Sequence, residues 1–178
     1  MASPKRTPRQ LHPVDRHQYA DLPRHSLILC ASMVRNPANL GGLCRIADVF
    51  RLEALVVASL AQTQTAAFRG TAASAYQWQP IRLCDSGILS PWMQQKRMEG
   101  YCCVALHCDP GATPLGQFRF PQKSVLLLGQ ELTGLPDPVL AECDRQVVIQ
   151  QYGLVESLNV QQAAAIAVYE YIRQQGSG

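Results

Sequence analysis

The sequence has no apolar run long enough to cross a membrane and no apolar segment behind its basic N-terminus. A transmembrane helix needs about 20 consecutive apolar residues, and a secretory signal needs an apolar core of its own. Pro4, Lys5, Arg6 and Pro8 interrupt the stretch where such a core would lie. These absences predict a soluble, cytoplasmic protein with no membrane contact and no signal peptide.

No Cys-x-x-Cys spacing is present either, although the chain has seven cysteines. Their number is odd, their positions are scattered, and several lie in apolar runs, where cysteine behaves as a small apolar residue. This pattern favours a reducing compartment over a disulfide framework and argues against a zinc site. We therefore expect no metal cofactor.

Two common nucleotide-binding motifs are also missing. Gly129 and Gly134 bracket a G-x-x-x-x-G segment, but Leu135 and Pro136 follow where a phosphate-binding loop needs lysine and a hydroxyl residue. No predicted strand is followed by G-x-G-x-x-G. The chain is therefore not expected to be a nucleoside triphosphatase or to bind a cofactor in a Rossmann-type site.

The net charge is concentrated at one end of the chain. The first 25 residues hold five basic and two acidic side chains, which account for the whole formal net charge of +3. A basic terminal segment of this kind is either a solvated tail or a contact for nucleic acid phosphates. We expect residues 1–25 to form a flexible arm, residues 26–175 to form one domain, and residues 176–178 to be a linker.

Short β-type runs alternate with helical patterns over the remainder. Continuous apolar strands separated by helix-length segments are typical of an α/β fold with a mainly parallel sheet and helices on both faces. The expected strands are 27–34, 54–58, 101–107, 125–128 and 146–149, and the expected helices are 40–50, 71–77, 86–99, 137–143 and 157–174. Open sheets of this class bind ligands at the carboxyl ends of their strands. The segments at those ends are 35–39, 106–114, 129–136 and 150–157.

Three segments carry a more specific signal: Asn39 to Arg45, Leu128 to Pro136, and Ser157 to Val160 leading into an Ala-rich helix. In this order they resemble the three motifs of the SpoU/TrmH branch of the SPOUT methyltransferases, and the resemblance covers most of residues 26–174. It implies an α/β knot, in which the C-terminal part of the chain threads into a deep trefoil knot. It also implies methylation of ribose 2′-hydroxyls in RNA.

The resemblance further implies where the site lies. S-adenosylmethionine is expected at backbone groups near Leu106, Gly129, Ile149 and Leu158. The polar wall of the active site is expected to consist of Asn39, Arg45, Glu131, Ser157 and Asn159. One departure concerns the cofactor loop, because Gln150 and Gln151 stand where many members have Pro-Met.

Arg45 suits methyl transfer to a hydroxyl. During the transfer the sulfonium loses its positive charge and the ribose oxygen loses a proton, so negative charge develops on that oxygen. A guanidinium can stabilise this charge and also bind the adjoining phosphate. Because the pKa of arginine lies above about 12, we assign Arg45 an electrostatic role and leave the proton to water or a phosphate oxygen. The structural alternative is a simple i,i+3 pair with Asp48.

Other polar residues also have structural alternatives. Ser157, Asn159 and Asn39 are candidates for helix N-caps, and Glu131 for a solvated loop acid. His107 is expected to be a partly buried packing residue. For Trp78 and Trp92 we expect a role as core or interface anchors.

The resemblance points most strongly to tRNA methyltransferases that modify the D-loop guanosine at position 18. The segment Gln77-Trp78-Gln79-Pro80 adds to this likeness. The alternatives are a wobble-position or ribosomal RNA 2′-O-methyltransferase, and a catalytically silent RNA-binding factor on the same fold. The Ala-rich helix is either a core helix or a subunit interface, and the resemblance favours a homodimer.

Overall fold

The computed structural model describes residues 19–155 and 157–175. Its strands are β1 (His25–Ala31), β2 (Leu52–Val57), β3 (Ile81–Leu83), β4 (Cys102–Leu106), β5 (Thr113–Pro114), β6 (Ser124–Leu128) and β7 (Arg145–Val148). The α-helices are α1 (Pro37–Val49), α2 (Ala66–Ala72), α3 (Leu89–Met98), α4 (Asp137–Ala141) and α5 (Val160–Gln175). Short 3-10 helices are η1 (Tyr19–Asp21), η2 (Leu60–Gln64), η3 (Ala75–Gln77), η4 (Ser86–Ile88) and η5 (Leu115–Gln117).

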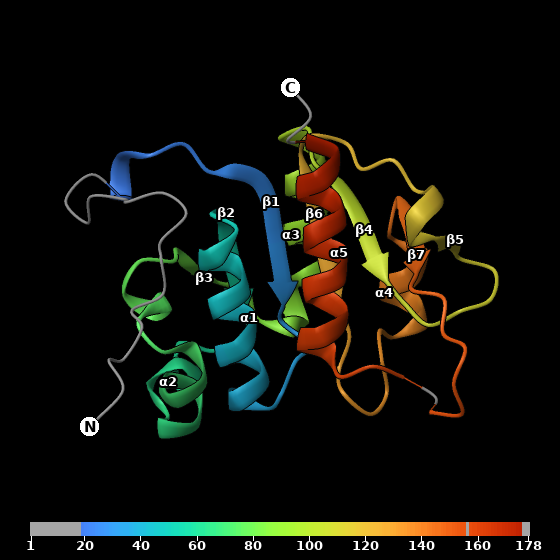
Figure 1. Ribbon diagram of the computed structural model, residues 1–178. Coiled ribbons are helices and arrows are strands. Elements are labelled where there is room, and N and C mark those ends of the chain that lie inside the picture. The colour runs from blue at the N-terminus through green and yellow to red at the C-terminus, as the bar shows by residue number, and fades with distance from the viewer. Residues whose placement is uncertain (1–18, 156, 176–178) are drawn as a thin grey trace, which may run out of the picture.

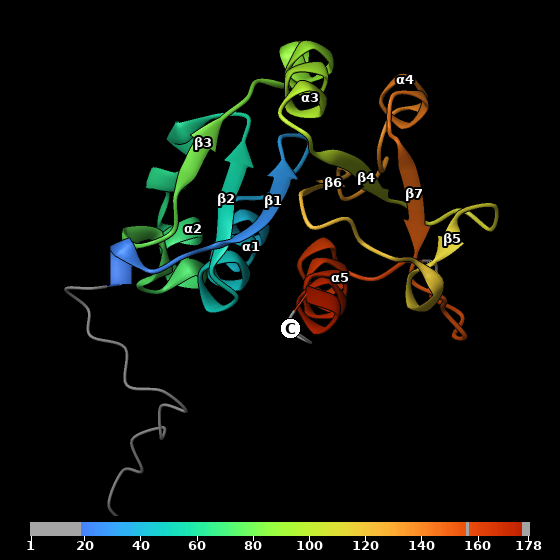
Figure 2. The same ribbon diagram turned by 90° about the horizontal axis from the view of Figure 1, so that it is seen from above.

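The seven strands form one sheet in the order β3-β2-β1-β6-β4-β7-β5, and all its pairings are parallel. Figure 2 shows α1, α2 and α5 on one face of this sheet and α3 and α4 on the other. The expected α/β class, with a parallel sheet and helices on both faces, is confirmed. The C-terminal trefoil knot is not established by this arrangement and stays a prediction.

The central strands contribute side chains to two apolar layers, because successive side chains of a strand point to opposite faces of the sheet. In β1, Leu27, Leu29 and Ala31 belong to the core under α1, α2 and α5, whereas Ile28 and Cys30 belong to the core under α3 and α4. All five side chains are at most 2% exposed. The central strands are therefore covered on both sides, which explains their continuous apolar sequence.

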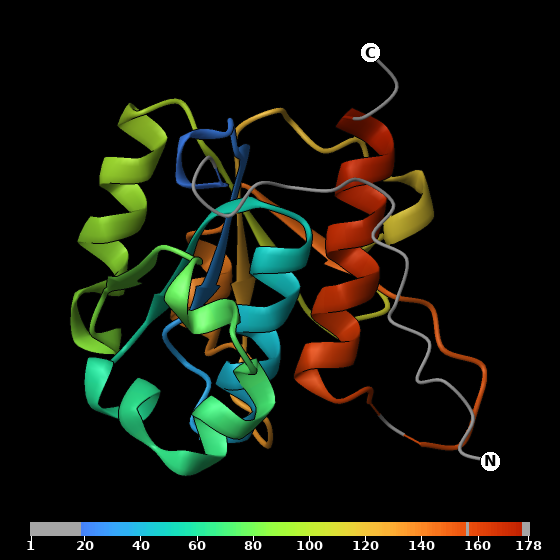
Figure 3. The same ribbon diagram turned by 60° about the vertical axis from the view of Figure 1, so that its left-hand side comes forward.

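Two glycines let α1 pack closely against its neighbours. A Cβ atom at Gly41 would lie 2.4 Å from the backbone oxygen of Phe68 in α2, and one at Gly42 would overlap the side chain of Gln161 in α5. As a result α1 and α5 lie side by side, with both N-termini at the carboxyl edge of the sheet (Figures 1 and 3).

The five expected strands are all present, with shifted ends, but two further strands and one helix differ from expectation. β3 was not expected, and β5 lies inside the segment expected to be a loop. The helix expected at 71–77 is wrong: α2 ends at Ala72, and Ala73 has a φ of +52°, which a right-handed helix cannot contain.

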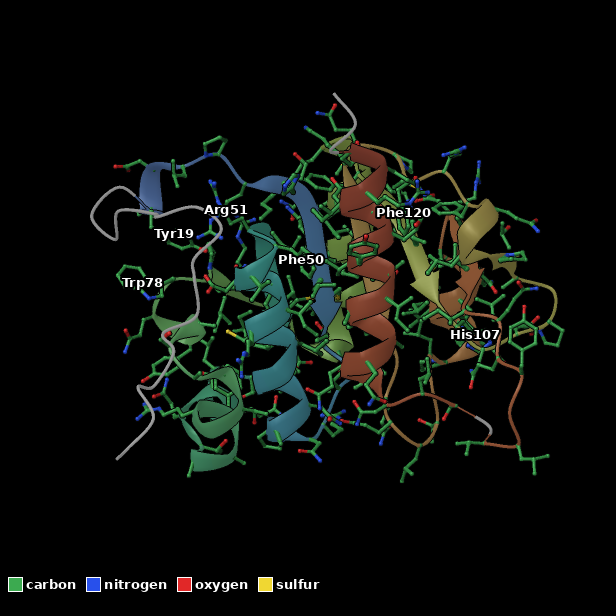
Figure 4. All side chains as sticks on the ribbon, in the orientation of Figure 1. Tyr19, Phe50, Arg51, Trp78, His107 and Phe120 are labelled. Carbon is green, nitrogen blue, oxygen red and sulfur yellow. The ribbon has the colours of Figure 1, made fainter. Side chains whose placement is uncertain are left out.

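The described part of the N-terminal segment packs against the domain. The Arg24 guanidinium donates hydrogen bonds to the backbone oxygens of Leu52 and Trp78 and to the side chain of Gln79. The ring of Tyr19 meets that of Trp78 edge-on at 5.9 Å (Figure 4). The other basic residues of the expected arm, Lys5, Arg6, Arg9 and Arg16, lie outside the described residues, as do residues 176–178.

Within the described ranges, no helix is long and apolar enough to cross a membrane. Trp92 is partly buried against the core under α3 and α4, as an anchoring residue should be. Trp78 is 36% exposed and contacts the ring of Tyr19 rather than the core.

Candidate active site

A pocket of about 470 Å³ opens at the carboxyl edge of the sheet. Three loops and the first turns of α5 line it, and the loops follow β4, β6 and β7. This is the position at which open α/β sheets bind ligands. The lining residues are Leu106, His107, Cys108, Leu128, Gly129, Gln130, Glu131, Leu132, Gly134, Val148, Ile149, Gln151, Ser157, Leu158, Asn159, Val160 and Ala163.

All four residues expected at the cofactor, Leu106, Gly129, Ile149 and Leu158, line this pocket. The loop after β6 is a tight turn, because Gln130 and Gly134 exchange two backbone hydrogen bonds of 2.9 Å each. A Cβ atom at Gly129 would lie 2.4 Å from the carbonyl carbon of Gly134. Glycine is therefore required at position 129, and it brings bare backbone to the pocket wall.

Three of the expected polar residues form a hydrogen-bonded chain behind the pocket. Asn39 donates from Nδ2 to Oε1 of Glu131 at 2.9 Å, and its Oδ1 accepts from Nδ2 of Asn159 at 3.1 Å. Asn39 is 6% exposed, whereas Glu131 and Asn159 reach the pocket. The chain joins α1, the loop after β6 and the start of α5 into one unit.

The helix caps at the site differ in part from expectation. Asn36, not Asn39, caps α1: its side chain accepts from the backbone nitrogen of Ala38 at 2.9 Å, and Pro37 occupies the first helical position. Asn159 caps α5 by accepting from the backbone nitrogen of Gln161 at 2.9 Å. Cap and site positions therefore coincide in Asn159 but not in Asn39. Ser157 is exposed and lines the pocket.

Glu131 is not a solvated loop acid. Its Oε1 accepts from the backbone nitrogen of Asn36 at 3.0 Å, in addition to Asn39, and its Oε2 accepts from the backbone nitrogen of Arg35 at 3.2 Å. Partial burial acts to raise the pKa of this carboxyl, but the hydrogen bonds from Asn39, Asn36 and Arg35 outweigh burial and lower it. The N-terminus of α1 therefore holds Glu131 as a carboxylate.

Arg45 lies apart from this chain of hydrogen bonds. It is exposed on α1, six residues beyond Asn39, or roughly 9 Å along the helix axis at 1.5 Å per residue. It does not line the pocket, and among the described residues no hydrogen bond or ion pair engages its guanidinium. The alternative pair with Asp48 is wrong, because the ion pairs among the described residues do not include it. Asp48 Oδ1 instead accepts from the Tyr19 hydroxyl at 2.6 Å.

The structure adds residues that the motifs did not indicate. Gln151, at the departure from the expected Pro-Met, lines the pocket and its Nε2 lies 3.5 Å from the sulfur of exposed Cys108. His107 is half-buried, as expected, but also lines the pocket (Figure 4). In the part of the chain that the structure describes, no group of three His, Cys, Asp or Glu side chains is arranged to hold a metal ion.

Comparisons with known proteins agree with this geometry. The model of the SpoU rRNA Methylase family matches residues 26–169. A tRNA (guanosine(18)-2′-O)-methyltransferase of Mus musculus is 41% identical over 149 residues, which are 84% of this chain and 9% of that protein. The enzyme of the same name from Saccharomyces cerevisiae is 36% identical over 152 residues, 85% of this chain and 11% of that protein. The chain thus spans about a tenth of the length of these relatives.

A solved structure of similar fold carries a ligand. The SpoU methyltransferase AviRb from Streptomyces viridochromogenes, in complex with the cofactor AdoMet, has a TM-score of 0.70 and 26% sequence identity. The match covers 93% of this chain and 64% of that one.

Proposed function

Since the chain belongs to the SpoU rRNA methylase family, we propose that it transfers a methyl group from S-adenosylmethionine to a ribose 2′-hydroxyl of RNA. The observation that carries the proposal is the pocket at the carboxyl edge, with the hydrogen-bonded chain of Asn39, Glu131 and Asn159 beside it. The AdoMet complex of the similar AviRb structure supports the choice of cofactor.

The residues that line the pocket fit this cofactor. Leu106, Ile149 and Leu158 offer apolar contacts for an adenosine, and the glycine turn at Gly129 offers backbone groups at close range. The volume of about 470 Å³ suits a nucleoside-sized ligand. When bound, S-adenosylmethionine supplies a methyl group activated by its sulfonium charge.

The residues around the pocket have separate roles in this proposal. Glu131 holds Asn39, and Asn39 holds Asn159, so that Asn159 and Ser157 present polar groups to the ribose at a fixed distance from the cofactor. The exposed guanidinium of Arg45 stabilises charge on the ribose oxygen and binds a neighbouring phosphate. The proton of the hydroxyl leaves to water or to a phosphate oxygen.

We further propose that the substrate is tRNA, methylated at the D-loop guanosine at position 18. The names of the mouse and yeast relatives support this choice. A cytoplasmic location is part of the same proposal. The basic residues among positions 1–18 would then add phosphate contacts, whereas Arg24 is occupied by hydrogen bonds within the domain.

A homodimer belongs to the same proposal. The Ala-rich stretch itself is a core element, because Ala164 and Ala167 are fully buried under the sheet. On the outer side of α5, however, Ile166 is 44% and Tyr169 60% exposed. These two side chains line a hollow together with η5 and the loop after β7, so a second copy that covered them would lie against that side of α5. The C-terminal knot is part of the proposed fold.

Two measurements test the function. Radiolabelled methyl transfer from S-adenosylmethionine to a tRNA transcript should occur, and it should vanish when guanosine 18 is replaced by 2′-deoxyguanosine. Persistence of transfer on that transcript would redirect the assignment to a wobble-position or ribosomal RNA site. S-adenosylhomocysteine should raise the melting temperature, corresponding to about 2.7 kcal/mol at a hundredfold excess over Kd, and ATP should not. A chain that binds RNA but transfers no methyl group would be a silent RNA-binding factor.

A further inference from the structure

The loop between β1 and α1 holds a second arginine, Arg35, whose backbone is fixed on both sides. Its N–H donates to Oε2 of Glu131 at 3.2 Å, and its carbonyl oxygen accepts from Nε2 of Gln62 at 3.2 Å. Val34 before it is fully buried, and Pro37 after it begins α1. The peptide units of Arg35 are therefore held at the rim of the pocket that Glu131 lines.

The side chain of Arg35 has no acidic partner in the part of the chain that the structure describes. It is exposed, and no ion pair within residues 19–155 and 157–175 includes it. Glu131, the adjacent acid, binds the backbone of Arg35 rather than its guanidinium, because neutral N–H groups and the N-terminus of α1 already balance the carboxylate. The positive charge of Arg35 therefore faces solvent beside the pocket, on a backbone that hydrogen bonds hold in place.

Gln62 is placed to serve this arrangement. It lies in η2, which Ser59 caps at its start, and the backbone oxygen of Gln62 accepts from the hydroxyl of Thr65 at 2.9 Å. Its Nε2 bonds to the Arg35 carbonyl, but its Oε1 is buried and finds no partner among the described residues. A buried unpaired acceptor is unfavourable. The one side-chain hydrogen bond of the Gln62 amide among the described residues is therefore the bond to the carbonyl oxygen of Arg35.

We propose that Arg35 binds a phosphate of the RNA next to the methylated ribose, and that Gln62 is the positioning residue that directs Arg35 to it. The inference rests on the proposed function for the identity of the polyanion. A guanidinium suits a phosphate because its planar fork can donate two parallel hydrogen bonds. Arg35 precedes α1 and Arg45 lies within it, so the two guanidinium groups engage the RNA from positions on either side of Asn39 in the sequence.

The test compares variants of the 178-residue chain in binding to one tRNA transcript at several salt concentrations. Arg35→Ala should reduce the magnitude of the slope of log K against log[salt] by about 0.7–0.9, the value for one phosphate contact. The KM for RNA should rise about tenfold, while kcat at saturating RNA and the affinity for S-adenosylhomocysteine stay within about twofold. Arg35→Lys should keep the slope, because the charge remains, but bind more weakly.

Arg145→Ala is the matched control. Arg145 is also exposed, but it begins β7 and so lies at the opposite edge of the sheet. Its substitution should leave the slope and KM unchanged. An unchanged slope in Arg35→Ala, or an equal loss in Arg145→Ala, would overturn the assignment of Arg35.

Gln62→Met tests the positioning role. It should reproduce part of the rise in KM without lowering the melting temperature, since it also removes the unpaired oxygen. The double variant with Arg35→Ala should bind no worse than Arg35→Ala alone, because Gln62 acts through Arg35. Additive effects with a lower melting temperature would mean that Gln62 is only structural. A wild-type chain that binds tRNA with the Arg35-dependent slope but transfers no methyl group would refute the proposed function and leave the Arg35 contact in place.

Discussion

Asn159 donates a hydrogen bond from Nδ2 to Oδ1 of Asn39 at 3.1 Å, between residues 120 positions apart in the sequence. The same Asn39 side chain donates to Glu131, so its amide is used in both directions. An uncharged amide donates on one side and accepts on the other, whereas a carboxylate of the same shape can only accept. This requirement makes position 39 sensitive to a substitution that changes a single atom.

Asn39→Asp should destabilise the protein most strongly at neutral pH. The new carboxylate would face Oε1 of Glu131, which lies 2.9 Å from the present nitrogen. We expect a loss of at least about 1–3 kcal/mol at pH 7, partly recovered near pH 5, because one of the two acids then takes up a proton. Urea unfolding at both pH values measures this. Asn39→Ala, the control, should show no recovery, and equal losses for Asn39→Asp at both pH values would contradict the arrangement.

Glu131→Gln should remove a pH-dependent part of the stability. The pKa of Glu131 is lowered in the folded protein, so its contribution is fully present above the ordinary pKa of 4.5 and is lost as the pH falls through the folded value. The variant should be about 1–3 kcal/mol less stable at pH 7, because all three partners of the carboxylate are N–H donors and the new amide nitrogen would face one of them. The difference from wild type should shrink below pH 4.5.

The comparison for this prediction is Asp137→Asn, which removes an exposed charge on α4. Unfolding curves of the three proteins between pH 3 and pH 7 are sufficient. If the difference in the free energy of unfolding between wild type and Glu131→Gln were the same at every pH, the lowered pKa of Glu131 would contribute nothing to stability.

Gly41→Ala and Gly42→Ala should differ although they are adjacent. At Gly41 the added Cβ meets the backbone oxygen of Phe68 at 2.4 Å, so α1 and α2 must separate, at a cost of about 1–3 kcal/mol. At Gly42 the nearest atom is the end of the Gln161 side chain, which can rotate away. There the gain in helix propensity of about 1 kcal/mol offsets the cost. Thermal unfolding separates the two, and equal melting temperatures would contradict this packing.

Ala73→Gly should stabilise the protein. Ala73 has φ +52° and ψ −127°, a conformation that a residue with a Cβ adopts only at a cost. After allowance for the more flexible unfolded chain, we expect a gain of about 1 kcal/mol. Ala67→Gly, at an exposed position within α2, should instead lose about 1 kcal/mol. A loss in both variants would rule out strain at position 73.

Arg45→Ala should strongly reduce methyl transfer without affecting cofactor binding. Its guanidinium lies outside the pocket, so we expect a fall in kcat of about 10²–10³ and unchanged affinity for S-adenosylhomocysteine. Arg45→Lys should restore little, because an ammonium lacks the planar fork. Calorimetric titration of the variants with S-adenosylhomocysteine provides the check. A joint loss of cofactor affinity and activity would mean that Arg45 acts on the cofactor.

The sequence predicted the central strands because both of their faces are buried, which gives a continuous apolar run. It did not reveal β3 and β5, which have three and two residues and lie at the edges of the sheet. The cap of α1 was within reach, since Asn36 precedes a proline at the first helical position, an arrangement typical of helix starts. The sequence motifs identified Asn39, Glu131 and Asn159 as site residues. They did not indicate the order of contact, in which Asn39 bonds to both of the others.

That order depends on packing between distant segments. Asn39 and Glu131 are 92 residues apart, and no local pattern specifies which atom of one faces which atom of the other. The exposure of Arg45 likewise depends on where α5 and the N-terminal segment pack against α1. The Ala-rich sequence around position 73 has high helix propensity, but the path of the chain between α2 and β3 overrides it.

The chain of hydrogen bonds through Asn39 also bears on how the protein folds. The bond between Asn39 and Glu131 closes a loop of 92 positions, and the bond between Asn159 and Asn39 closes one of 120. The complete chain therefore requires β1, β6 and α5 to be in place, and the loop-closure entropy of most of the sequence opposes it. Long-range contacts of this kind form late and slow folding. Refolding from denaturant should therefore restore helical circular dichroism before it restores affinity for S-adenosylhomocysteine, and a nascent chain that lacks α5 has no site with which to sequester the cofactor.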